Sequence, residues 1–198
     1  MADEELLEFL QVMRRLRAEC PWKAAQTHRS LARYLLEETH ETLEALDTGD
    51  GPHLREELGD LLLQVFFHTV IAEQDGEFTT GDVAGDIAAK MRRRNPHVFG
   101  DSQERHDGAD LDPSGVNDLW ESRKAEEKRR ASVTEGLPPG LPALLYADKV
   151  LDRLERAGVA PRFPGERLGD RLLALVAEAR ADGVDPEQAL RDAVRRLM

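Results

Sequence analysis

The sequence predicts an all-α protein, an antiparallel helical bundle followed by a small helical appendage at the C-terminus. Most of the 198-residue chain has apolar residues at helical spacing. Alternating apolar and polar runs between turns, which are typical of strands, are absent, and aromatic residues make up only 5% of the chain. Helix-capping and helix-breaking residues also separate the periodic segments.

The periodic segments define eight predicted helices. Thr48-Gly49-Asp50-Gly51-Pro52 ends the second helix and begins the third, because glycine commonly ends a helix and proline is favoured in its first turn. Asp185-Pro186 begins the last helix in the same way. The predicted ranges are 3–18, 29–47, 52–75, 80–94, 114–131, 141–157, 165–182 and 186–197.

Two stretches interrupt the helices. Residues 100–114 are polar and rich in turn-forming residues, which predicts a loop. Residues 132–142 contain repeated proline and glycine and are predicted to form a linker. The predicted organisation is therefore a regular helical domain over 1–131, the linker 132–142, and a smaller helical segment over 143–198.

Charge and hydropathy exclude several classes of protein. The chain has 27 Lys and Arg against 39 Asp and Glu, a formal net charge of −12. This charge disfavours a polymeric nucleic-acid partner, whose binding depends on neutralised phosphates. The acidic N-terminus does not resemble a secretion signal, and the longest apolar stretch, Leu61–Ala72, is too short to span a membrane. With a single cysteine, Cys20, the chain is expected to be cytoplasmic, without a membrane partner.

The helix predicted over 29–47 carries two acidic residues close to its apolar face. Glu38 falls inside one edge of the apolar arc, and Glu41 lies just beyond that edge. A glutamate that only improves solubility would lie on the opposite face, so Glu38 is expected to point partly into the protein. For Glu37 and Glu44, an ordinary solvated helix face is an equally good interpretation.

The helix predicted over 52–75 has a sharper pattern. It is apolar nearly all round between residues 58 and 72, which predicts a buried helix. A short turn joins it to the helix before it, so the two should pack antiparallel and bring the acidic residues of both helices face to face. The polar exceptions in this helix share one stripe and are Glu57, Asp60, Gln64 and His68.

The four carboxylates of Glu38, Glu41, Glu57 and Asp60 would repel one another and lose hydration in this interface unless they bind a cation. Oxygen ligands without a nearby cysteine favour Mg²⁺, with Mn²⁺ as a substitute, over zinc. A site of this kind leaves coordination positions for water and for substrate phosphates.

Two further pairs of residues suit a nucleotide. Lys90 and Arg94 are four residues apart on one helix, share a face, and suit phosphate oxygens. Trp120 and Lys124 repeat this spacing on the next helix and suit a stacked base and its phosphates. Taken alone, the first pair also fits a solvated basic turn, and Trp120 also fits a core position.

With these residues the chain resembles the MazG family, nucleoside triphosphate pyrophosphohydrolases of the all-α NTP pyrophosphatase superfamily. The family motif, EExxE followed after a spacer by ExxD, is matched by Glu37-Glu38-x-x-Glu41 and Glu57-x-x-Asp60. The resemblance runs from about residue 5 to 150. The other matches follow in order and are Leu16-Arg17, Cys20-Pro21-Trp22, Gln26-Thr27-His28, Tyr34-Leu35-Leu36, Arg93-Arg94-Asn95-Pro96-His97-Val98-Phe99, Trp120-x-x-x-Lys124 and Leu141-Pro142-Ala143-Leu144.

The resemblance implies hydrolysis of an NTP or dNTP to the monophosphate and pyrophosphate, for nucleotide-pool control or house-cleaning. It also implies a homodimer, because members of the family pair helices between subunits. The implied catalytic Mg²⁺ ligands are Glu38, Glu41, Glu57 and Asp60, with Glu37 as a further candidate. The implied substrate-binding residues are Lys90, Arg94, Trp120 and Lys124.

The chain departs from the family pattern in three places. Lys23 stands where the family usually has Asp, and Asn95 replaces the usual His, but neither position belongs to the metal ligands. The segment 143–198 resembles a degenerate second copy of the domain, in which Arg167 stands beside Asp170 in place of the ExxD glutamate. One active site per chain is expected, in the N-terminal part.

Two other classes of protein compete with this enzyme. A di-iron carboxylate bundle would need two Glu-x-x-His pairs, and the sequence contains one, Glu37-x-x-His40. A non-catalytic helical module that binds a nucleotide or a protein is the second alternative. The intact set of four carboxylates argues against it.

Overall fold

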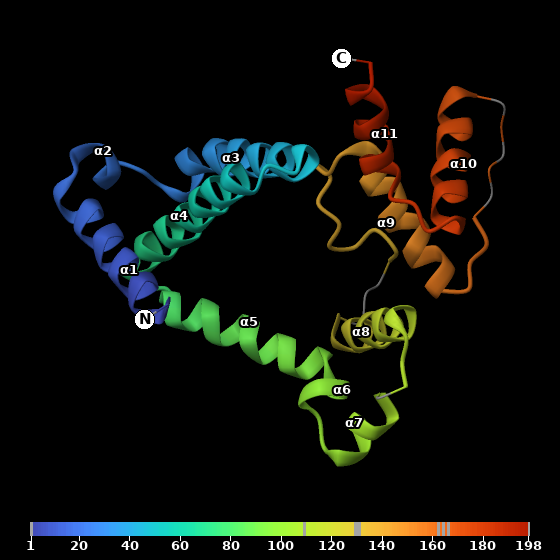
Figure 1. Cartoon of the computed structure of the whole chain (residues 1–198), viewed down its shortest axis with the longest axis horizontal. Coiled ribbons are helices and arrows are strands. Elements are labelled where there is room, and N and C mark those ends of the chain that lie inside the picture. Colours follow the sequence, from blue (N-terminus) through green and yellow to red (C-terminus); the bar gives the residue numbers. More distant parts are fainter. Residues whose placement is uncertain are drawn as a thin grey trace. The chain divides into compact units, whose positions relative to one another are not determined.

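The computed structural model describes residues 2–108, 110–128, 132–161, 163, 165 and 167–197, and the regular structure in this part of the chain is entirely helical (Figure 1). The predicted all-α class is therefore confirmed. None of the described helices combines the length and the apolar character that a membrane span requires. The helices are α1 (Ala2–Glu19), α2 (Pro21–Ala24), α3 (His28–Thr48), α4 (Gly51–Asp75), α5 (Thr80–Arg94), α6 (Pro96–Phe99), α7 (Ser102–Gly108), α8 (Pro113–Lys128), α9 (Ala143–Arg156), α10 (Leu168–Ala181) and α11 (Pro186–Arg195).

Eight of these helices match the predicted ones, with ends shifted by a few residues. The predicted helix end and domain boundary at residue 131 lie outside the described residues. The short helices α2, α6 and α7 are additional, and α7 lies in the stretch predicted as a loop. It begins there because Asp101 caps it: the Asp101 Oδ1 atom accepts a hydrogen bond from the backbone N–H of Glu104 at 2.9 Å.

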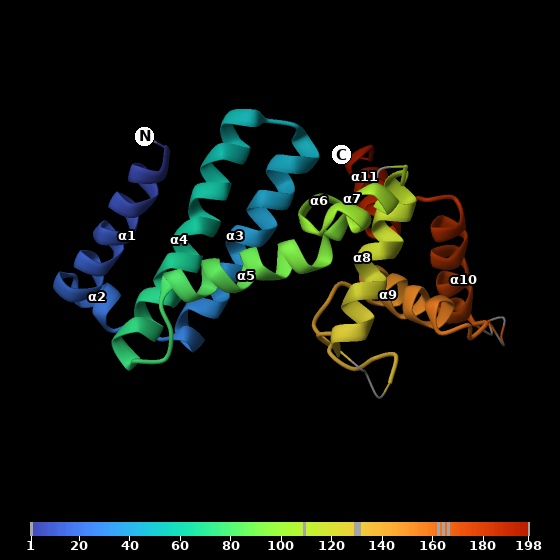
Figure 2. The same ribbon diagram turned by 90° about the horizontal axis from the view of Figure 1, so that it is seen from below.

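The chain forms two compact units, Met1–Trp120 and Glu121–Met198. In the first unit, α1, α3 and α4 surround the hydrophobic core, and Figure 2 shows these three helices running alongside one another. α5 follows α4 and diverges from it. The buried core residues are Leu10, Met13, Leu31, Phe66, Phe67, Val70 and Ile71.

The α3–α4 hairpin positions the acidic residues. Gly49 ends α3 with a φ of 69°, the left-handed conformation that favours glycine, and the chain reverses there. Glu38 and Asp60 lie equally far along the chain from Gly49, as do Glu41 and Glu57. An antiparallel hairpin therefore brings the two members of each pair to the same level.

The predicted complete burial of α4 is wrong for part of the helix. Phe67 and Val70 are 1% and 2% exposed, whereas Leu58 is 52% and Val65 44% exposed. Residues of α1 share the core with the C-terminal half of α4. Leu58 and Val65 are two helical turns apart and share one face of α4, which stays exposed in the described part of the chain.

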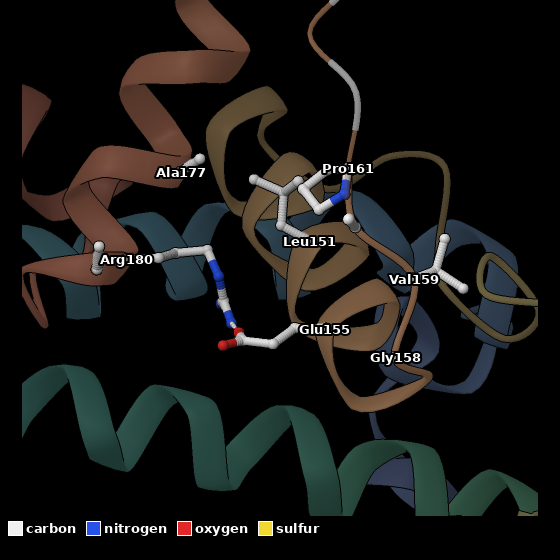
Figure 3. A pocket seen from close by; sticks show the side chains of 9 residues that line it. Leu151, Glu155, Gly158, Val159, Pro161, Ala177 and Arg180 are labelled. Atoms are coloured by element: carbon white, nitrogen blue, oxygen red, sulfur yellow. Dashed lines mark hydrogen bonds and ion pairs between the residues drawn. The ribbon is translucent and has the colours of Figure 1, made fainter.

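The second unit contains α9, α10 and α11, with Leu151 and Val176 as its buried apolar residues. Arg180 of α10 ties that helix to α9 through ion pairs with three acidic residues, Asp148 at 2.7 Å, Asp152 at 3.3 Å and Glu155 at 3.0 Å. Figure 3 shows Arg180 and Glu155 beside a cavity of about 420 Å³ between the two helices. These three acidic residues therefore help to hold α9 and α10 together.

Candidate active site

Three carboxylates meet where α3 and α4 face each other. Glu38 and Glu41 of α3 and Glu57 of α4 each offer one oxygen, and these oxygens all lie within 4.8 Å of one another. The three residues differ in exposure, since Glu57 is 8% exposed as a whole residue, Glu38 is half-buried and Glu41 is exposed. This cluster of Glu38, Glu41 and Glu57, which we call the carboxylate cluster, joins the two halves of the predicted motif.

The Glu38 carboxyl group shows the electrostatic effect of this arrangement. Burial raises its pKa above the ordinary value, and the negative charges of Asp60, Glu41 and Glu57 raise it further. Asp60, which is half-buried, is therefore close enough for its charge to act on Glu38. Glu37 is exposed and does not belong to the carboxylate cluster.

The carboxylate cluster fits a hard divalent cation. The Glu57 Oε2 atom is buried and has no hydrogen-bond partner among the described residues. A buried carboxylate oxygen without a partner is costly, and a cation would satisfy it while reducing the repulsion at Glu38. Because all donors are carboxylate oxygens, the site suits Mg²⁺ or Mn²⁺.

Of the four residues predicted to contact substrate, two are in contact with each other in the structure. Arg94, at the end of α5, is 7% exposed, and its guanidinium carbon lies 5.2 Å from the centre of the Trp120 ring on α8. Lys90 is half-buried one turn earlier on α5. Lys124 belongs to the second compact unit, where its Nζ atom lies 2.7 Å from Glu121 Oε1. The structure thus pairs Arg94 with Trp120.

Two polar features near the cluster have no assigned role in the sequence prediction. His53 lies one turn before Glu57, and its Nε2 atom is 3.0 Å from Glu57 Oε1. The i, i+4 spacing of a histidine and a glutamate is the signal that could have found this contact.

The polar stripe of α4 also continues beyond the carboxylates. Gln64 is 4% exposed and its Oε1 atom has no hydrogen-bond partner among the described residues. One turn further, the His68 ring stacks on His28 of α3, with 2.7 Å between the two Nδ1 atoms. Burial lowers the pKa of His68, and the neighbouring His28 lowers it further. Only the stripe itself was visible in the sequence, because the facing residue depends on the pairing of the helices.

Comparison with known proteins gives a family for this arrangement. A family model described as the MazG nucleotide pyrophosphohydrolase domain matches residues 26–99. The matched range contains the carboxylate cluster, Asp60, Lys90 and Arg94, and it ends before Trp120.

Individual relatives extend the similarity over nearly the whole chain. An uncharacterized 26.1 kDa protein of Streptomyces cacaoi is 49% identical over 193 residues, covering 95% of this chain and 77% of that protein. The nucleoside triphosphate pyrophosphohydrolase/pyrophosphatase MazG of Thermotoga maritima is 36% identical over 218 residues, covering 96% of this chain and 82% of that protein. The nucleoside triphosphate pyrophosphohydrolase of Mycobacterium tuberculosis is 41% identical over 193 residues, and the chain spans 55% of its length.

Proposed function

The chain belongs to the MazG family, and we propose that it is a metal-dependent nucleoside triphosphate pyrophosphohydrolase that converts an NTP or dNTP to the monophosphate and pyrophosphate. The names of the relatives from Thermotoga maritima and Mycobacterium tuberculosis support this activity. The observation that carries the proposal is the carboxylate cluster in the matched domain, because the buried Glu57 Oε2 atom has no hydrogen-bond partner among the described residues and suits a cation.

In this proposal Glu38, Glu41, Glu57 and Asp60 hold Mg²⁺, or Mn²⁺ in its place, with Glu37 as a further ligand candidate. When bound there, such a cation would supply positive charge for the triphosphate and would lower the pKa of a coordinated water molecule that serves as the nucleophile. The chain contributes the fixed geometry, since the ligands lie on two helices joined by a tight turn.

Basic residues on other helices complete the proposed site. Lys90 and Arg94 supply positive charge for phosphate oxygens, and Arg94 is already held against the Trp120 ring. Trp120 and Lys124 are proposed as contacts for the base and its phosphates.

The proposed domain organisation is a catalytic domain over 1–131, a linker over 132–142 and a degenerate second domain over 143–198.

The decisive experiment measures pyrophosphate release from a panel of NTPs and dNTPs with Mg²⁺ or Mn²⁺. Glu57→Gln is expected to lower turnover roughly 100-fold or more, because even residues that only support a metal ligand account for about 10- to 100-fold. Glu56→Gln, an exposed neighbour on the same helix, is the matched control and should keep full activity. Nucleotide binding without pyrophosphate release would instead favour the non-catalytic module, and iron content without Mg²⁺ dependence would favour the di-iron bundle.

We also propose that the protein is a homodimer. Leu58 and Val65 lie on one face of α4 and are 52% and 44% exposed, and Leu36 of α3 is 61% exposed. Apolar side chains in this number on a helical hairpin suit a second copy of the chain. Leu58→Glu should lower the mass measured by light scattering to that of a monomer, whereas an unchanged mass would contradict the assignment of this face to the dimer interface.

The expected cytoplasmic location and the house-cleaning role stay predictions.

A further inference from the structure

His53 contacts one of the two oxygens of the Glu57 carboxylate. Its Nε2 atom lies 3.0 Å from Glu57 Oε1, and the two side chains are 37% and 10% exposed. Glu57 Oε2 is buried and has no hydrogen-bond partner among the described residues. The two oxygens of this carboxylate are therefore in different environments.

The backbone of His53 is itself held in place. The Asp50 side chain caps α4 by accepting a hydrogen bond from the His53 backbone N–H at 3.1 Å. Pro52 in the first turn restricts the backbone further. His53 and Glu57 are one helical turn apart, so the imidazole reaches the carboxylate from a fixed part of the helix.

Glu57 needs such a contact because its position is electrostatically unfavourable. It lies in the carboxylate cluster, within 4.8 Å of oxygens from Glu38 and Glu41. Without a donor, repulsion would favour rotamers that turn Glu57 away from these two residues. A donor at Oε1 opposes this rotation and keeps Oε2 available to a cation.

We infer that His53 is a positioning residue, which holds Glu57 in the rotamer that presents Oε2 to the divalent cation. The inference rests on the metal site of the proposed function, and it adds a residue outside the EExxE and ExxD motifs. A hydrogen-bonded partner of a metal-binding carboxylate commonly determines both its orientation and the affinity for the metal. The role needs only an N–H donor at this position.

The test measures the binding of Mn²⁺ alone to the full chain by electron paramagnetic resonance, without nucleotide. His53→Ala is expected to weaken Mn²⁺ binding by about 10- to 100-fold. His53→Gln should recover much of the affinity, because its amide N–H can donate from a similar distance. Arg55→Ala, an exposed neighbour on α4, should bind Mn²⁺ like the unaltered protein.

Two control measurements separate positioning from folding and from catalysis. Circular dichroism and thermal unfolding without metal should be similar for His53→Ala and Arg55→Ala, so that lost affinity reflects the site. Unchanged Mn²⁺ affinity in His53→Ala, or no recovery in His53→Gln, would overturn the inference. Pyrophosphate release is assayed separately: if the unaltered protein bound Mn²⁺ in a His53-dependent way but released no pyrophosphate, the proposed function would fail while the positioning role would stand.

Discussion

At the scale of single residues, the crowding of negative charge in the carboxylate cluster is expected to lower the stability of the metal-free protein. Burial and the neighbouring acids raise the pKa of Glu38. When the pKa of a carboxyl group is higher in the folded state than in the unfolded state, its contribution to the free energy of unfolding falls with rising pH. The fall takes place between the unfolded-state pKa and the folded-state pKa. Glu38 is thus expected to contribute less stability to the metal-free protein at neutral pH than at low pH.

Glu38→Gln is therefore expected to stabilise the metal-free protein at pH 7, by about 1 kcal/mol in the free energy of unfolding. The reason is that the amide removes one charge from a group of like charges. In the unaltered protein, Mg²⁺ should raise the unfolding temperature, and this rise should be lost in Glu38→Gln. Thermal unfolding with and without Mg²⁺ measures both effects, and Glu56→Gln, at an exposed position outside the proposed ligands, serves as control. A less stable metal-free Glu38→Gln protein would contradict this account.

How far single residues could be predicted depends on where their partners lie. Glu38, Glu41 and Glu57 could be brought together from sequence, because helical periodicity and a short turn determine which faces of a hairpin meet. The contact between His28 and His68 could not, since it depends on the register of α3 against α4. The contact of His53 with Glu57 had a local signal, but many histidines at this spacing remain solvated.

At the scale of elements, the apolar pattern of α4 does not determine which of its faces neighbouring helices cover. Its composition predicts burial on every side, but burial depends on which neighbours cover each face. α1 and α3 enclose Phe67 and Val70, whereas Val65 stays exposed in the single chain. The short helix α7 was likewise missed, because its polar residues carry no apolar periodicity and its start depends on the Asp101 cap.

The two faces of α4 should respond differently to truncation. Phe67→Ala removes a side chain that is 1% exposed and should lower the free energy of unfolding by about 3–5 kcal/mol. Val65→Ala, at a 44% exposed position, should have little effect on the fold of the single chain. Chemical denaturation measures both values. A large loss for Val65→Ala that depends on protein concentration would place this residue in the subunit interface.

At the scale of the whole molecule, the two compact units contain a similar short sequence that is preceded by a different residue in each unit. Leu58-Gly59-Asp60 of the first unit recurs as Leu168-Gly169-Asp170 in the second. In the first unit, Glu57 precedes this triplet and faces the acidic residues of α3. In the second, Arg167 takes the corresponding place.

The second unit also lacks a counterpart of the carboxylate cluster in the described part of the chain, where the one group of this kind is formed by Glu38, Glu41 and Glu57. The acidic residues of α9 are held by Arg180 instead. These three carboxylates share an ion-pair partner on the neighbouring helix, whereas those of the carboxylate cluster face one another.

This difference predicts one active site per chain and can be tested at equivalent positions of the two triplets. Asp60→Asn should lower pyrophosphate release roughly 100-fold or more, because Asp60 is proposed as a cation ligand together with the carboxylate cluster. Asp170→Asn makes the same chemical change in a unit without such a cluster and should leave the rate within about twofold, as expected for a substitution away from a functional site. Pyrophosphate release under saturating Mg²⁺ compares the two. If Asp170→Asn lowered the rate as strongly as Asp60→Asn, the second unit would have to contribute to catalysis, and a single site in the first unit would be wrong.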